Sequence, residues 1–211
     1  MRSFGMIIGI TGPSGSGKSL FCSMLAERGF TVLDCDKIYH DMISAPGECT
    51  AALAREFGNE ILNAQGGIDR SALADRVFNS ADALERLNSI TRKHVVRRIE
   101  ELAHSAEAAG DQVAVDAPTL FEAGADYICG MTVGILAPRR TRASRLAARD
   151  GNIRTEKQLR ARLDASKPDS FYTDRCDITF RNDKGNDALE AFAEQISSGT
   201  YAKANKKGSA T

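Results

Sequence analysis

The segment Gly12-Pro13-Ser14-Gly15-Ser16-Gly17-Lys18-Ser19 constrains the fold more than any other part of the sequence. It matches the pattern G-x-x-x-x-G-K-[ST], in which glycines allow a tight turn that aims successive backbone N–H groups at phosphate oxygens. A helix that begins at the end of such a turn adds the positive end of its dipole. An apolar run precedes the motif and an amphipathic stretch follows it. The alternative, a Gly/Ser-rich loop that only caps a helix, explains less of this pattern, and ATP is the ligand indicated.

The overall composition argues against several other classes of protein. The 28 basic residues balance the 28 acidic ones, so bulk charge gives no reason to expect a nucleic acid or an anionic membrane as partner. The five cysteines are odd in number and form no CxxC pair, which argues against a disulfide framework and a zinc site. The three histidines have no metal-ligand spacing. No run reaches the roughly 18 apolar residues of a membrane span, and we expect a cytoplasmic protein.

Short apolar runs alternate with stretches of helical period, which is typical of strands and helices around a parallel sheet. The expected strands are residues 6–11, 31–34, 112–116, 131–137 and 177–180, and the expected helices are residues 18–28, 139–149, 155–165 and 187–196. The fold class predicted is therefore α/β, a three-layer α/β/α core with a five-stranded parallel sheet.

The long interval between the second and third strands predicts a helical insertion. It contains an amphipathic helix at residues 84–99, preceded by turn signals at Pro46-Gly47 and Gly66-Gly67. We expect one kinase-sized domain over residues 1–200, with its core at 1–38 and 110–200 and the insertion at about 39–109. Such an insertion often carries the acceptor pocket. Residues 139–155 would form a lid, and residues 201–211 a disordered tail.

Three aspartates stand where strands of this sheet end. Asp34 and Asp36 close the second strand at positions that share a strand face, and Asp116 closes the third. The carboxyl ends of parallel strands lie along one rim, where ligands bind. A carboxylate there can accept the proton of an attacking hydroxyl or bind Mg²⁺, so Asp36 is a candidate base and Asp116 a candidate metal ligand. The alternative for Asp36 is that it only caps the following helix.

Arg145 and Arg149 would share one face of the helix after the fourth strand. Guanidinium groups stabilise the charge of a transferred phosphoryl group, often from a mobile lid. The alternative is a solvated basic face that pairs with Asp150 and Glu156.

Several motifs together resemble the dephospho-coenzyme A kinase family, in that family's order and from about residue 6 to residue 196. Besides the phosphate loop they are Asp34-Cys35-Asp36, Gly67-Ile68-Asp69-Arg70, Leu87-Asn88, Asp116-Ala117-Pro118-Thr119-Leu120-Phe121-Glu122, Arg145-x-x-x-Arg149-Asp150 and Phe180-Arg181-Asn182-Asp183. The resemblance implies transfer of the ATP γ-phosphate to the ribose 3′-hydroxyl of dephospho-coenzyme A, the last step of coenzyme A biosynthesis, with Mg²⁺ as cofactor.

The resemblance also implies roles for individual residues. Asp36 would be the general base and Lys18 the phosphate clamp, and Arg145 and Arg149 would belong to the lid. The nucleotide would be bound by Gly12, Ser14, Gly15, Ser16, Gly17, Lys18, Ser19, Leu20 and Asn182, the acceptor by Asp34, Asp36, Pro118, Leu120, Phe121 and Glu122, and the metal by Ser19 and Asp116. The expected partner is this small-molecule acceptor, and the expected state is a monomer or a weak homo-oligomer.

Four places depart from the family pattern. Arg92-Lys93 replaces a His-Pro pair, Thr119 replaces a leucine, Lys167 replaces a common glutamine, and Pro13-Ser14 replaces Gly-Ile. All leave the phosphate chemistry intact. Because positions 92–93 and 119 fall where acceptor recognition is expected, a nucleoside or nucleotide kinase of the same P-loop branch stays an alternative. A non-catalytic ATP-binding regulator is a third hypothesis, although it would need neither a base nor a lid.

Overall fold

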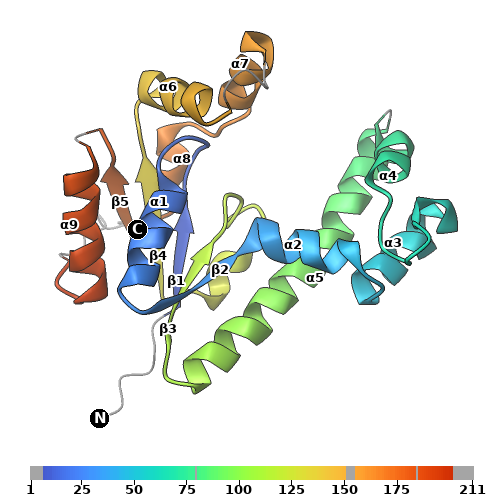
Figure 1. Cartoon of the computed structure of the whole chain (residues 1–211), viewed down its shortest axis with the longest axis horizontal. Coiled ribbons are helices and arrows are strands. Elements are labelled where there is room, and N and C mark those ends of the chain that lie inside the picture. The colour runs from blue at the N-terminus through green and yellow to red at the C-terminus, as the bar shows by residue number, and fades with distance from the viewer. Residues whose placement is uncertain (1–6, 79, 151–154, 184, 202–211) are drawn as a thin grey trace, which may run out of the picture. The chain divides into compact units, whose positions relative to one another are not determined.

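The computed structural model describes residues 7–201, apart from residues 79, 151–154 and 184. Its strands are β1 (Ile7–Thr11), β2 (Phe30–Asp34), β3 (Gln112–Asp116), β4 (Met131–Leu136) and β5 (Ile178–Arg181) (Figure 1). Its helices are α1 (Lys18–Glu27), α2 (Cys35–Ser44), α3 (Glu48–Phe57), α4 (Arg70–Val77), α5 (Ala81–Ala108), α6 (Arg139–Asp150), α7 (Glu156–Asp164), α8 (Asp169–Thr173) and α9 (Asn186–Ser197), with short 3₁₀ turns η1 (Asn59–Ile61) and η2 (Ala125–Ile128). Met6 of the first expected strand, residues 151–154 of the expected lid and the expected tail after Tyr201 lie outside the described residues.

The central strand of the sheet is β1. The strand order is β2-β3-β1-β4-β5, five strands that all run parallel. Ile10 pairs with Asp116 of β3, and Thr11 pairs with Gly134 of β4. Every residue of β1 is buried, as expected for a strand covered on both faces. The predicted α/β fold class with a five-stranded parallel sheet is confirmed, and the loop that follows β1 begins between two neighbouring strands.

The chain forms two compact units. We call Met1–Val32 with Ala106–Thr211 the core unit, and Leu33–Ser105 the helical unit. The helical unit has its own hydrophobic core, built from α2, α3, α4, η1 and the first part of α5. Its short helices follow from the turn signals, since α2 ends just before Pro46-Gly47 and α4 begins after Gly66-Gly67. Within the described residues no helix has both the length and the apolar character needed to cross a membrane.

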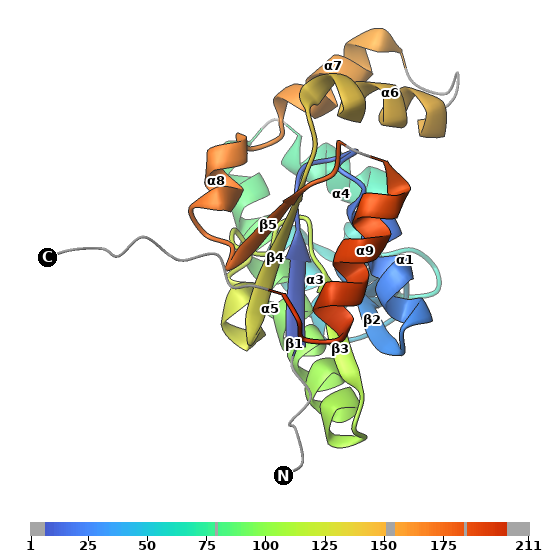
Figure 2. The same cartoon turned by 90° about the vertical axis from the view of Figure 1, so that its left-hand side faces the viewer.

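Helices cover both faces of the sheet in the core unit. In Figure 2, α1 and α9 lie together on one side of the strands and α8 lies on the other. The alternation of β4 explains this division: Val133 and Ile135 pack into the cluster with α1 and α9, whereas Leu136 packs with Tyr172 and Cys176 at α8. The sequence pattern did not predict α8, because a helix of five residues is too short to show a period.

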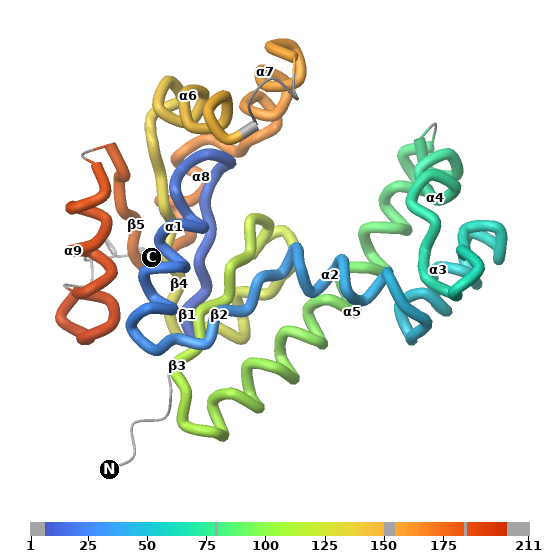
Figure 3. The backbone as a smooth tube through the Cα atoms, viewed as in Figure 1, coloured from blue at the N-terminus to red at the C-terminus, as the bar shows by residue number. Residues whose placement is uncertain are grey.

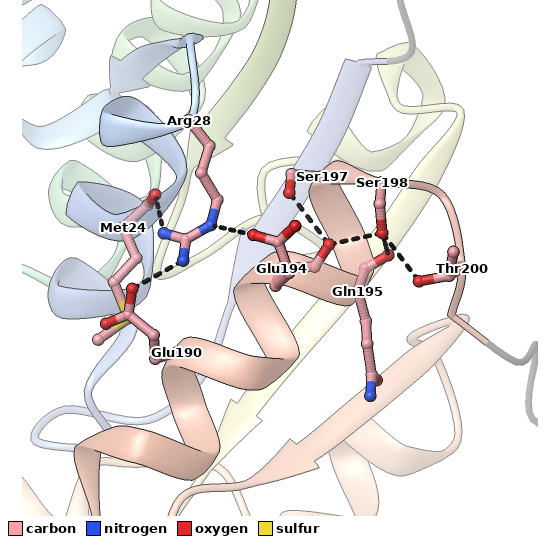
Figure 4. Close-up of polar contacts among 8 residues, drawn as sticks. All are labelled: Met24, Arg28, Glu190, Glu194, Gln195, Ser197, Ser198 and Thr200. Atoms are coloured by element: carbon pink, nitrogen blue, oxygen red, sulfur yellow. Dashed lines mark hydrogen bonds and ion pairs between the residues drawn. The ribbon is translucent and has the colours of Figure 1, made fainter.

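Polar and aromatic contacts join α1 to α9. The Arg28 guanidinium donates to Glu190 at 2.7 Å, to Glu194 at 3.1 Å and to the Met24 carbonyl at 2.9 Å (Figure 4). Beneath this surface network the Phe192 ring stacks on Phe21 and Phe180, with ring centroids 5.3 and 4.6 Å apart. The buried stack holds α1, and therefore the loop that precedes it, against the sheet.

We predict that Phe192→Ala lowers the free energy of unfolding by about 3 kcal/mol, because it leaves a cavity between two aromatic rings. Urea denaturation of both proteins measures this. Phe78→Ala is the matched control: this residue is 84% exposed, and the expected change is under about 0.5 kcal/mol. Equal losses in the two variants would show that the stack does not hold α1 in place.

Candidate active site

The loop from Gly12 to Gly17 connects the end of β1 to the start of α1, and Figure 3 shows it turning back under α6. Gly12 has φ +148° and a Cβ there would collide with the carbonyl of Ile135. Gly17, the residue before α1, has φ +102° and a Cβ there would collide with the amide of Asn182. Both positions therefore require glycine, for conformation and for space. The tight turn leaves the N–H groups at the start of α1 available to an anion.

Lys18 and Asp116 form an ion pair at the end of β1 and β3. Their side chains are only 12% and 10% exposed, so the two charges compensate each other in a largely water-free place. The pairing of Ile10 with Asp116 puts the carboxylate level with the end of β1, from which the loop departs. The sheet register thus brings the predicted phosphate clamp and the predicted metal ligand into contact.

Asn182 and Arg145 hold the outer side of the loop. The buried Asn182 amide donates to the Ser16 carbonyl at 2.8 Å, and Arg145 Nη1 donates to the same carbonyl at 3.0 Å. Arg145 Nη2 also contacts the Asn182 side-chain oxygen at 3.4 Å. Asn182 itself is placed by its backbone N–H, which donates to Leu136 at the end of β4 at 2.7 Å. Asn182, which comes late in the chain, and Arg145 of α6 therefore shape the loop together.

A buried polar atom inside the loop has no partner. The Ser16 side chain is completely buried, and its Oγ and the Nε of Arg142 are the buried side-chain nitrogen or oxygen atoms that lack a hydrogen bond in the part of the chain that the structure describes. Such groups are normally satisfied, so an unsatisfied hydroxyl beside a glycine cradle fits a loop built to receive oxygen-rich groups. The cradle, the Lys18 ammonium and the exposed first turn with Ser19 and Leu20 fit a polyphosphate.

The segment Pro118–Glu122 is attached to the same end of the sheet. The Thr11 hydroxyl donates to the Pro118 carbonyl at 3.2 Å. Leu120 is completely buried and packs near Gly9 of β1, so it anchors the segment. Phe121 lies edge-on to Phe171 of α8, and both it and Glu122 are half-buried. The predicted acceptor segment and the phosphate loop are therefore neighbours within the core unit.

Tyr172 of α8 lies beside this segment and is not available as a base. Burial raises the pKa of its phenol to about 12, and the negative charge of Glu122 adds to the shift. The phenol therefore stays protonated at neutral pH.

Asp34 and Asp36 lie at the start of α2 in the helical unit, and both are exposed. The cap of α2 is Asp34, whose carboxylate accepts from the backbone N–H of Lys37 at 3.0 Å. The alternative in which Asp36 only caps this helix is therefore wrong, because Asp36 lies inside the first turn. Asp34 has a structural role, whereas no capping bond accounts for Asp36.

The helical unit holds a pocket of about 240 Å³ between α2, α3 and α5. Its ionisable lining consists of Asp41, Glu48, His94, Arg97, Arg98 and Glu101. The hydrogen bond from Arg97 lowers the pKa of the Glu48 carboxyl. Burial, helped by the charge of Arg97, lowers the pKa of His94, so the imidazole is neutral at physiological pH. The departures Arg92 and Lys93 are exposed on α5 directly before this pocket residue.

Comparison with known proteins decides the family. The family model described as dephospho-CoA kinase matches residues 6–187. The chain belongs to the dephospho-CoA kinase family. Curated dephospho-CoA kinases of Corynebacterium efficiens and Anaeromyxobacter dehalogenans are 33% and 34% identical to it, over 90% of this chain and 94% and 90% of theirs. A crystal structure from Thermus thermophilus has a TM-score of 0.75 at 28% identity and covers 95% of this chain and 100% of that one.

Membership in the dephospho-CoA kinase family makes this chain an ATP-dependent kinase, as predicted. The main functional hypothesis is supported over the two alternatives, since the family match spans both the phosphate loop and the segment at 118–122. The individual site residues stay predictions. Arg149 lies in the last turn of α6, and the side chain of Asp150 lies outside the described part of the chain.

Two residues of this dephospho-CoA kinase family member contact the loop but were missed in the sequence. Arg142 Nη1 donates to the Ser14 carbonyl at 3.4 Å, and Arg162 Nε donates to the Ser14 hydroxyl at 3.4 Å. Arg142 precedes Arg145 by three residues, so helical spacing places both on one face of α6. That spacing is the signal in the sequence by which Arg142 could have been predicted to contact the loop. Arg162 comes from α7, and no local pattern connects that helix to the loop.

We predict that Asp116→Ala lowers the free energy of unfolding of the ligand-free protein by about 3 kcal/mol, because it leaves the Lys18 ammonium buried without a partner. The double variant Lys18→Met, Asp116→Ala should recover much of this loss, and urea denaturation of the wild type, the two single variants and the double variant gives the coupling. The control is Glu156→Ala, which breaks an ion pair with Arg160 whose side chains are 77% and 72% exposed. If the losses in free energy of unfolding caused by the Lys18 and Asp116 substitutions simply add up in the double variant, the prediction is contradicted.

Proposed function

We propose that this protein transfers the γ-phosphate of ATP to the ribose 3′-hydroxyl of dephospho-coenzyme A. The bond between the γ-phosphorus and the bridging oxygen of ADP breaks, a bond to the acceptor oxygen forms, and the hydroxyl proton passes to a base. The observation that carries the proposal is the contact between Thr11 and Pro118, which joins the family's acceptor segment to the end of β1 beside the phosphate loop. Donor and acceptor groups would then meet at one end of the sheet.

The donor half of the mechanism uses the loop and its clamp. Backbone N–H groups of the loop, among them those of Gly15 and Gly17, and the Lys18 ammonium would bind the phosphates, which stabilises charge on the transferred group through preorganised donors. Arg145, which contacts the loop backbone, and Arg149 would add positive charge from α6.

Ser19 and Asp116 would hold Mg²⁺. A hydroxyl and a carboxylate are the hard oxygen ligands that Mg²⁺ prefers, so the residues present fit this ion. When bound, Mg²⁺ supplies positive charge that offsets the charge of the phosphate oxygens. Because Asp116 also holds Lys18, its substitution would affect both the ion and the clamp.

The acceptor half of the mechanism involves Asp36 as general base, with Pro118, Phe121 and Glu122 as acceptor contacts. The position of Asp36 supports this role, since it is exposed and its neighbour Asp34 already supplies the helix cap. The cationic side chains of Arg92 and Lys93, exposed on α5, suit an acceptor that carries a pyrophosphate. We infer that they compensate for the missing His-Pro pair of the family pattern.

The substrate prediction is tested by ADP release with ATP and Mg²⁺ over a panel of acceptors: dephospho-coenzyme A, adenosine, uridine, GMP and CMP. We expect turnover with dephospho-coenzyme A at least about tenfold above any other acceptor, since a site built for its groups discriminates by more than about 1.4 kcal/mol. Mass and phosphorus NMR of the product should locate the new phosphate on the ribose 3′-oxygen. Preferential turnover of a nucleoside or nucleotide would overturn the assignment.

The role of the base is tested by comparing Asp36→Asn with Asp34→Asn. Asp36→Asn should lower kcat by about 10² to 10⁴-fold, the usual contribution of a general base, while the Kd for ATP changes little. Asp34→Asn is the matched control, because asparagine caps a helix as well as aspartate does. If Asp34→Asn abolishes turnover and Asp36→Asn does not, the base is Asp34.

A further inference from the structure

Arg142 is a buried cation that the proposed mechanism does not use. Only 7% of the residue is exposed, and burial lowers the pKa of its guanidinium, an effect that the charge of Asp169 partly offsets. Among the described residues its hydrogen-bond partners are neutral: the Ser14 carbonyl at 3.4 Å and the Ser166 hydroxyl at 3.1 Å. Buried arginines are usually paired with carboxylates, because an uncompensated charge is costly to bury. What the guanidinium contacts is therefore informative about its role.

The contact with Ser14 acts on one particular peptide unit. The Ser14 carbonyl and the Gly15 N–H belong to the same peptide, in the middle of the loop whose N–H groups face an anion. A cation on the carbonyl side polarises that peptide and strengthens its N–H as a donor on the opposite side. Arg145 and Asn182 act in the same way on the Ser16 carbonyl and the Gly17 N–H.

Helix α6 also packs directly on this peptide. A Cβ on Gly15, which has φ +81°, would lie 2.8 Å from the Arg142 carbonyl oxygen and 3.0 Å from Leu146 Cγ. Through Ser166, which follows α7, the same guanidinium ties the end of that helix to the loop. The backbone and side chain of Arg142 therefore fix the loop from one side.

We propose that Arg142 is a positioning residue of the nucleotide site, which holds and polarises the Ser14–Gly15 peptide so that the Gly15 N–H binds a phosphate oxygen of ATP. The inference rests on the nucleotide half of the proposed function and is independent of the acceptor. Arg142 does not touch the phosphates in this role. It acts through the loop, in parallel with the contacts to Ser16.

The test measures ATP binding by calorimetry without any acceptor, for the wild type, Arg142→Met and Arg142→Lys. We expect Arg142→Met to raise the Kd for ATP about tenfold, which corresponds to the loss of one charge-assisted hydrogen bond. Arg142→Lys keeps the charge but reaches fewer acceptors, and should raise the Kd only about threefold. In steady-state assays the KM for ATP should rise in step, with the KM for dephospho-coenzyme A unchanged and kcat within about twofold.

The matched control is Arg140→Met, which removes the same charge from the exposed face of the same helix. Its Kd for ATP should stay within about twofold of the wild-type value. A purely structural Arg142 would lower the melting temperature of Arg142→Met without changing its Kd for ATP, and that result overturns the proposal. An equal rise in Kd for Arg140→Met would overturn it as well, by showing that bulk charge is responsible.

Two further outcomes keep the test decisive. If Arg142→Met does not fold, Arg142→Lys carries the test, and a wild-type Kd for that variant contradicts the proposal. If the wild type binds ATP but does not phosphorylate dephospho-coenzyme A, the proposed function fails while the Arg142 comparison still stands.

Discussion

The parallel pairing of β1 with β3 and β4 is the constraint on which the rest of the site depends. β1 ends between two strands, so the loop that follows it emerges beside Asp116 of β3 and beneath the helix that follows β4. The Lys18–Asp116 pair, the Thr11 contact to Pro118 and the contacts from α6 all exist because three strands end at this level. A shift in the register of β1 by one residue would turn every side chain of the strand to the other face of the sheet. All of these contacts would then be lost.

The two faces of the phosphate loop have different physical roles. Its inner face carries N–H groups for an anion, whereas the carbonyls of Ser14 and Ser16 lie on its outer side and need donors from elsewhere in the chain. Those donors are Asn182, directly after β5, and Arg145 and Arg142 of α6. Exposed ion pairs elsewhere, such as Arg97 with Glu101 on α5, contribute little to stability, because water screens them. The electrostatics that matter here are the few buried contacts around one turn of backbone.

Much of this arrangement could be predicted from the sequence, and the part that could not has a physical reason. Strand β3 coincides with the predicted residues 112–116 because its apolar run ends sharply at Asp116. The loop was identifiable because its chemistry requires glycines at fixed positions. In contrast, α8 is too short to show a period. The sequence could not decide which aspartate caps α2, because Asp34 and Asp36 both satisfy the local rule for a helix cap; in the structure the cap is Asp34. The contacts of Arg142 and Arg162 depend on how α6 and α7 pack, which no local pattern records.

The contact between Asn182 and Ser16 has a consequence for the order in which the parts of the phosphate loop form. The two residues are 166 positions apart in the chain, yet the amide of one completes the loop formed by the other. During synthesis the N-terminal part of the chain emerges and begins to fold first, and contacts between distant residues form last. The residues of the phosphate loop are thus synthesised early. Their contact with Asn182 forms late, when β5 joins the edge of the sheet beside β4. A chain that still lacks β5 and Asn182 carries the complete motif without the contact that shapes its Ser16 carbonyl.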